Sequence, residues 1–257
     1  METIRLTQRC LVAVLKETAR RCSGIAIEHR GLFLVAANHP CPVLMNSALR
    51  AGNMDPTQVL SQAAEFFGAL GNQFELWTLD GVDEDLEKAA RAAGMRLAAE
   101  LIGMVIHRAP TVPAPADGVE VYRVKDAQGV REFVDVAAEG FQEEAPCLPG
   151  LIRAIFSDPR SLLADDTAAY VSRDRGRPAS AAMSMVKEGV AWIGWVATRP
   201  EARGRGLGGL TTASATRAGF ELGAKFASLE ATKMGVPVYT RLGFREILRY
   251  RNYCQGE

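Results

Sequence analysis

Hydrophobic positions in the second half of the chain alternate between the spacing of strands and that of helices. Residues 191–198 form a nearly continuous apolar run, which is typical of a buried strand. Residues 207–222 follow with the pattern of a helix, and the turn that leads into it reads Arg203-Gly204-Arg205-Gly206. The sequence therefore predicts a strand, a glycine-rich turn and a helix in direct succession.

The remaining patterns of this half predict a mixed α/β unit. Asp126 is a suitable N-cap for a helix whose apolar residues fall on one face. The expected strands are 119–124, 168–173, 179–186, 225–231 and 244–253, and the expected helices are 127–139, a short one within 141–158, and 237–242.

The first half shows the same order of elements. Asp55 and Pro56 have the residue types of an N-cap and a first helical position. Strands are expected over 32–37, 43–49, 74–79 and 97–107, and helices over 8–21, from Pro56 onward, and over 86–93. This order favours a duplicated fold, with an unrelated α/β domain as the alternative.

A proline-rich stretch separates the two halves. Three prolines lie within residues 110–118, which predicts an extended connector. We therefore expect a first domain at 1–109, a linker at 110–118 and a second domain at 119–257.

Composition narrows the classes of function. The 257 residues carry 30 basic and 30 acidic side chains, so no overall positive field recruits nucleic acid. No apolar run is long enough to span a membrane, and no signal peptide is evident. The five cysteines show neither a zinc spacing nor an even disulfide framework, which suits a reducing cytoplasm. We expect a cytoplasmic protein without a bound metal.

The glycine-rich turn has the chemistry of a phosphate cradle. The first amides of a helix lack intrahelical acceptors, and the helix dipole favours negative charge there. Glycines allow the backbone to approach an anion closely. A flexible surface turn rich in arginine and glycine is the alternative interpretation.

A second motif lies downstream and supports the cradle. Arg203, Gly206 and Gly208 are followed, after the expected helix and strand, by Tyr239 and the pair Gly243-Phe244. Together these residues resemble the GNAT superfamily of acetyl-CoA-dependent N-acyltransferases, and the resemblance covers roughly residues 118–254. It implies tandem GNAT-like folds of the α/β (α+β) class, each with a mixed, mostly antiparallel sheet flanked by helices. The first half resembles a degenerate copy.

The resemblance also implies a cofactor site. The strand 191–198 would pair its backbone with the pantetheine arm, and the turn amides would hold the diphosphate. Thr232 would replace an asparagine that many members have. The residues implied to bind acetyl-CoA are Val196, Ala197, Thr198, Arg203, Gly204, Arg205, Gly206, Leu207, Gly208, Gly209 and Thr232.

Catalytic roles follow from the same resemblance. Tyr239 matches the general acid that protonates the leaving thiolate, because a phenol and an alkyl thiol have similar pKa values. Glu230 is a candidate base, with a solvated strand residue as the equal alternative. Glu143 and Glu144 are weaker candidates for binding a cationic acceptor, and a charged loop face is the alternative for them.

These features predict an acetyl-CoA-dependent N-acetyltransferase that acts on a primary amine of a small molecule or peptide. A non-enzymatic acetyl-CoA sensor or scaffold is the alternative. In the first half, the turn at 50–55 has one glycine and an acid at the helix entry, so we expect no acetyl-CoA there. We expect no nucleic-acid or membrane partner, and a homodimer, common among relatives, is left open.

Overall fold

The computed structural model describes residues 2–143 and 145–255. The helices are α1 Glu2–Arg21, α2 Pro56–Leu70, α3 Glu84–Ala92, α4 Ala127–Phe141, α5 Leu148–Ile155, α6 Leu207–Glu221 and α7 Val236–Arg241, with 3₁₀ turns η1 Pro159–Ser161 and η2 Pro200–Ala202. The strands are β1 Ile25–His29, β2 Leu32–Ala36, β3 Asn46–Arg50, β4 Glu75–Leu79, β5 Met95–Ile106, β6 Val119–Arg123, β7 Thr167–Asp174, β8 Arg177–Lys187, β9 Val190–Thr198, β10 Phe226–Ala231 and β11 Arg245–Gln255.

Helix starts follow the sequence signals closely. Asp126 accepts a hydrogen bond from the Gly129 amide at 2.8 Å and begins α4. Asp55 accepts from the amides of Thr57 and Gln58 and begins α2, with Pro56 at its first position. Strand β1 was missed, because its five residues are all exposed and lack the in–out alternation that marks a half-buried strand.

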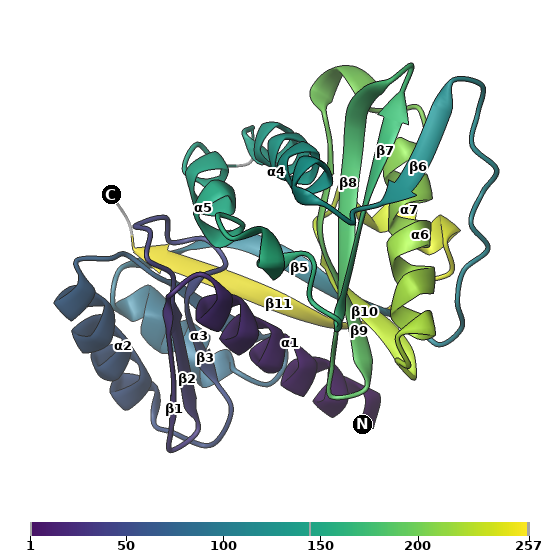
Figure 1. Ribbon diagram of the computed structural model, residues 1–257. Coiled ribbons are helices and arrows are strands. Elements are labelled where there is room, and N and C mark those ends of the chain that lie inside the picture. The colour runs from purple at the N-terminus through teal and green to yellow at the C-terminus, as the bar shows by residue number, and fades with distance from the viewer. Residues whose placement is uncertain (1, 144, 256–257) are drawn as a thin grey trace.

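The described strands form one continuous sheet through both halves. Its order is β1-β2-β3-β4-β11-β5-β10-β9-β8-β7-β6, and the pairs β3–β4 and β9–β10 are parallel. One lobe contains β1–β4 with their helices, and the other contains β6–β10 with theirs. The long strand β11 crosses the middle of the molecule between these two lobes (Figure 1).

The two lobes exchange their last strands. Strand β5, from before the linker, pairs with β10 of the second half, while β11, from the far side of the linker, pairs with β4 of the first half. The two exchanged strands also pair with each other. The linker at 110–118 therefore does not divide the sheet, and the domain boundaries stay a prediction.

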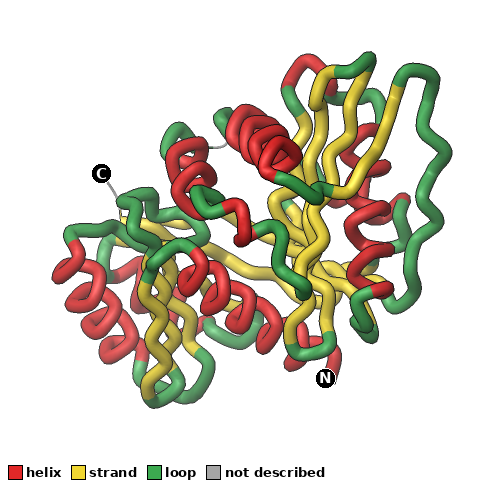
Figure 2. Tube along the Cα trace, viewed as in Figure 1, coloured by secondary structure: helices red, strands yellow, loops and turns green. Residues whose placement is uncertain are grey.

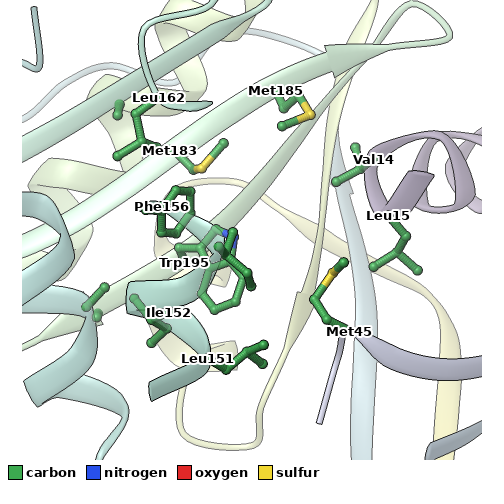
Figure 3. Packing of buried hydrophobic residues seen from close by; sticks show 14 of the residues in the cluster. Val14, Leu15, Met45, Leu151, Ile152, Phe156, Leu162, Met183, Met185 and Trp195 are labelled. Atoms are coloured by element: carbon green, nitrogen blue, oxygen red, sulfur yellow. The ribbon is translucent and has the colours of Figure 1, made fainter. Parts of the chain in front are cut away.

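Helices cover both faces of this twisted sheet (Figure 2). One face packs under α1, α4 and α5 and forms a core that draws on both halves. Figure 3 shows part of this core, to which α1 contributes Val14 and Leu15, the first half Met45, α5 Ile152 and β9 Trp195. The opposite face carries α2 and α3 in the first half and α6 and α7 in the second.

A disulfide also joins the halves, which corrects the expectation of unpaired cysteines. Cys41 lies in the loop before β3, and Cys147 lies immediately before α5, with their Cα atoms 5.4 Å apart. The spacing of 106 residues gave no sequence signal, because the two loops meet only when the halves dock.

None of the described helices combines the length and apolar character needed to cross a bilayer.

Candidate active site

Strands β9 and β10 separate beyond their first few residues. Their parallel pairing runs only from Val190–Phe226 to Trp192–Ser228. On its other edge β9 stays paired with β8 as far as Thr198, with a bulge opposite Trp195, whose φ is +52°. Among the described strands, none pairs with the β10 side of residues 193–198, so this backbone edge is available for an extended ligand.

Val196, Ala197 and Thr198, the residues predicted to pair with a pantetheine arm, lie at the end of this free edge. Gly140 of α4 packs against them, because a Cβ there would lie 2.8 Å from the Ala197 Cβ and 3.2 Å from the Thr198 amide nitrogen. Helix α4 therefore covers the end of β9 closely.

The turn after β9 requires its glycines. Gly204 and Gly206 have φ values of +75° and +79°, a left-handed conformation that disfavours other residues. Gly208 faces Thr198, whose Oγ1 would be only 3.0 Å from an added Cβ. Helix α6 begins at Leu207, and in the described chain no side chain caps its first amides. The turn therefore presents unshielded amides, as an anion site requires.

Both arginines of the turn already have partners. Arg203 bonds the carbonyl oxygens of Thr198 and Gly140 at 3.3 and 3.0 Å and pairs with Glu143 at 2.5 Å. Glu143, considered for the acceptor, thus lies beside the cofactor turn instead. Glu144 lies outside the described residues.

Arg205 makes a second pairing that the sequence did not indicate. It bonds Asp174 at the end of β7, with one N–O distance of 2.9 Å, and this guanidinium holds the pKa of the Asp174 carboxyl below its usual range. Asp174, Arg199 and Glu201 line an adjoining hollow of about 370 Å³.

Tyr239 is buried on the face that carries α6 and α7. It lies in α7, edge-on to Phe244 at 6.1 Å between ring centroids. Its helix touches the first turn of α6, because Val238 Cγ1 would be 3.7 Å from a Cβ added to Gly209. Thr232 lies immediately after β10, and its carbonyl oxygen accepts hydrogen bonds from the amides of Gly235 and Val236. These bonds fix the start of α7.

Glu230 lies on the opposite face of the sheet. Its neighbours on β10, Leu229 and Ala231, pack with Tyr239, so the alternation of the strand directs Glu230 to the face of α1 and α4. Its Oε2 accepts a 2.8 Å hydrogen bond from the indole Nε1 of Trp192. Burial raises the pKa of the carboxyl to about 7.

Trp192 was not anticipated from the sequence. Its ring lies over Gly194, where a Cβ would collide with the six-membered ring, and it reaches from β9 to β10 just where the strands separate. The sequence did contain a signal for this position: a tryptophan at 192 and a glycine at 194 lie on the same face of a strand, where the ring can cover the glycine. Trp192 and Glu230 are each partly exposed as whole residues, although Oε1 of the Glu230 carboxyl is buried.

The equivalent turn of the first half is already filled by its own side chains. The Asp55 carboxylate occupies the first amides of α2, and Arg50 pairs with Asp83 at 2.7 Å and with Asp85 at 2.6 Å. An anion would have to displace the Asp55 cap, so the expected lack of acetyl-CoA binding has a physical basis here.

Comparison with known proteins agrees with this arrangement. The model of the acetyltransferase (GNAT) domain family matches residues 113–231. A search of curated proteins gave no match. The resemblance is thereby confirmed over residues 113–231, which include the glycine-rich turn; Tyr239 lies beyond the matched residues.

Solved structures show the same fold along most of the chain. A GCN5-related N-acetyltransferase from Kribbella flavida is 19% identical with a TM-score of 0.74, covering 96% of this chain and 95% of that one. A GCN5-related N-acetyltransferase-like protein from Streptococcus suis is 13% identical with a TM-score of 0.61 and 98% coverage of both chains. A tandem GNAT protein from the clavulanic acid biosynthesis pathway is 13% identical with a TM-score of 0.59, covering 87% and 77%. These likenesses confirm the predicted fold class.

Proposed function

We propose, on the premise that residues 113–231 form a GNAT acetyltransferase domain, that this protein transfers the acetyl group of acetyl-CoA to a primary amine of a small molecule or peptide. One observation supports this most: strands β9 and β10 separate directly beside the uncapped N-terminus of α6. An extended thioester fits such a gap if its diphosphate lies on the helix amides.

The residues that would hold acetyl-CoA follow from this geometry. The amides from Gly204 to Gly209 would bind the diphosphate, and the free edge of β9 at 196–198 would pair with the amides of the pantetheine arm. Arg203 and Arg205 would add charge, and a bound diphosphate would compete with Glu143 and Asp174 for them. Acetyl-CoA supplies the activated acetyl group when bound.

The two sheet faces divide the proton transfers. Glu230, with its pKa of about 7, takes the proton from the amine as the nitrogen attacks the thioester carbon. Tyr239, from the opposite face, gives a proton to the sulfur as the carbon–sulfur bond breaks. A backbone amide near the β9 bulge stabilises the developing oxyanion. The amine thus loses a proton and gains an acetyl group, and the leaving thiolate becomes a thiol.

The same hypothesis covers the setting of the reaction. We propose that the first half binds no acetyl-CoA, that the protein acts in the cytoplasm without a metal, nucleic acid or membrane, and that its acceptor approaches on the face of Glu230. A homodimer is compatible with this hypothesis.

The test is release of free thiol from acetyl-CoA across a panel of amines. Wild-type protein should release thiol with at least one amine, and Tyr239→Phe should lower kcat by about 10²-fold or more with little change in the KM for acetyl-CoA. A suitable control is Tyr170→Phe on β7. Equal turnover by Tyr239→Phe would remove the acid assignment, and tight acetyl-CoA binding without transfer to any amine would favour a sensor instead.

A further inference from the structure

Two buried oxygens near the proposed base have no hydrogen-bond partner. They are Oε1 of Glu230 and the hydroxyl of Tyr250, and neither makes a hydrogen bond to any of the described residues. Tyr250 is only 3% exposed. A buried polar group without a partner costs free energy, so two of them on one face of the sheet are candidates for sharing a bridging water.

The strand exchange brings Tyr250 to this region. Tyr250 lies on β11 between Leu79 of β4 and Leu101 of β5, and its ring packs against Trp77 at 5.4 Å between centroids. Only β5 separates β11 from β10, and opposite Glu230 that strand has Gly103, which the side chain of Leu248 from β11 covers. Tyr250 lies two residues beyond Leu248 and therefore projects to the same face of the sheet. The first half therefore sets the position of Tyr250.

The Glu230 carboxylate and the Tyr250 hydroxyl interact electrostatically. Burial and the Glu230 carboxylate raise the pKa of Tyr250, so its hydroxyl keeps its proton and remains a donor at neutral pH. The other titratable group there is the thiol of Cys10 on α1, whose pKa burial and Glu230 raise to about 12. Cys10 donates to the Val190 carbonyl, and Lys187 and Glu188 act on that thiol.

We propose that Tyr250 is a positioning residue for Glu230, donating a hydrogen bond toward Oε1 through a bridging water. Trp192 fixes Oε2 from β9, and Tyr250 directs Oε1 from β11. The carboxylate is then held from both sides with one lone pair aimed at the acceptor. This inference rests on the proposed function for its catalytic consequence, but the contact itself has an independent readout.

The experiment compares Tyr250→Phe with Tyr253→Phe in the full chain. Tyr253 is a matched control, because it lies on the same strand, is equally buried, and its hydroxyl bonds Glu87 and Arg91 on the opposite face. Carbon-13 NMR of labelled glutamate carboxyls, with Glu230→Gln to assign the signal, gives the pKa of Glu230 directly.

Loss of a donor to the charged form raises a carboxyl pKa, so Tyr250→Phe should raise that of Glu230 by about 0.5–1 unit. The acidic limb of kcat/KM should move upward equally, kcat should fall about tenfold, and the KM for acetyl-CoA should not change. Tyr253→Phe should change none of these. Difluorotyrosine at position 250, a stronger donor, should lower the pKa instead, and it keeps the test decisive if Tyr250→Phe folds poorly.

An unchanged pKa of Glu230 in both Tyr250 variants would overturn the inference. A failure of the proposed function has a different signature, because wild-type protein would then release no thiol while the carboxyl titration still responded to Tyr250→Phe. The two ideas can therefore fail separately.

Discussion

Gly206→Ala tests whether the turn before α6 binds the diphosphate. Gly206 has a φ of +79°, and no atom outside its immediate neighbours lies within 4 Å of an added Cβ. The substitution therefore introduces backbone strain without a steric collision. A residue other than glycine in this conformation costs roughly 1–2 kcal/mol.

The exposed turn can relieve that strain by relaxing, but the ligand needs the original conformation. Binding would then have to restore the strained backbone. A cost of about 1–2 kcal/mol corresponds to a roughly 5–30-fold rise in the Kd for coenzyme A. Isothermal titration of wild type and variant with coenzyme A measures this ratio without relying on turnover.

Gly94→Ala is the matched control. Gly94 precedes β5 in the first half, has a φ of +81°, and also has open space around an added Cβ. Both variants should lose similar stability in urea unfolding, but only Gly206→Ala should weaken coenzyme A binding. If the two variants bind coenzyme A equally well, the turn does not hold the diphosphate.

Three further predictions concern stability. Glu75 is buried and its pKa is raised to about 7, so its contribution to the free energy of unfolding is full below about pH 4.5 and is lost as the pH rises toward 7. Urea unfolding between these pH values should therefore show a smaller loss of stability for Glu75→Gln than for the wild type. An equal loss in both proteins would contradict the raised pKa of Glu75. Cys41→Ser opens a disulfide across 106 residues and should lower the free energy of unfolding by about 4–5 kcal/mol; added reductant should destabilise the oxidised wild type and leave the variant unaffected. Asp55→Ala removes the α2 cap and should cost about 1 kcal/mol in the same assay, while a change in the Kd for coenzyme A would show that the first half takes part in binding.

Local signals in the sequence predicted the elements around the site well. The apolar run of β9, the glycines before α6 and the caps Asp55 and Asp126 each act through neighbouring residues, so the chain itself contains the information. The matching order of elements in the two halves likewise indicated the tandem fold.

Features that depend on contact between the halves could not be predicted. Strands β5 and β11 are both long final strands, and no residue marks which lobe each one joins. The pairing of Cys41 with Cys147 and the placement of Tyr250 on the sheet face of Glu230 likewise depend on how the halves pack together. The partners of Arg203 and Arg205 were also hidden, because Glu143 and Asp174 come from distant segments.

The strand exchange also constrains how the protein can be assembled. Strand β11 follows every other described element in the chain, yet it fills the gap between β4 and β5. On a ribosome, the first lobe would wait with the edge of β4 unsatisfied until β11 emerges, so the two lobes would acquire their native structure together. If the chain is divided within the linker, each fragment expressed alone should consequently aggregate, because it lacks its exchanged strand. The two fragments expressed in the same cell should assemble into the native protein.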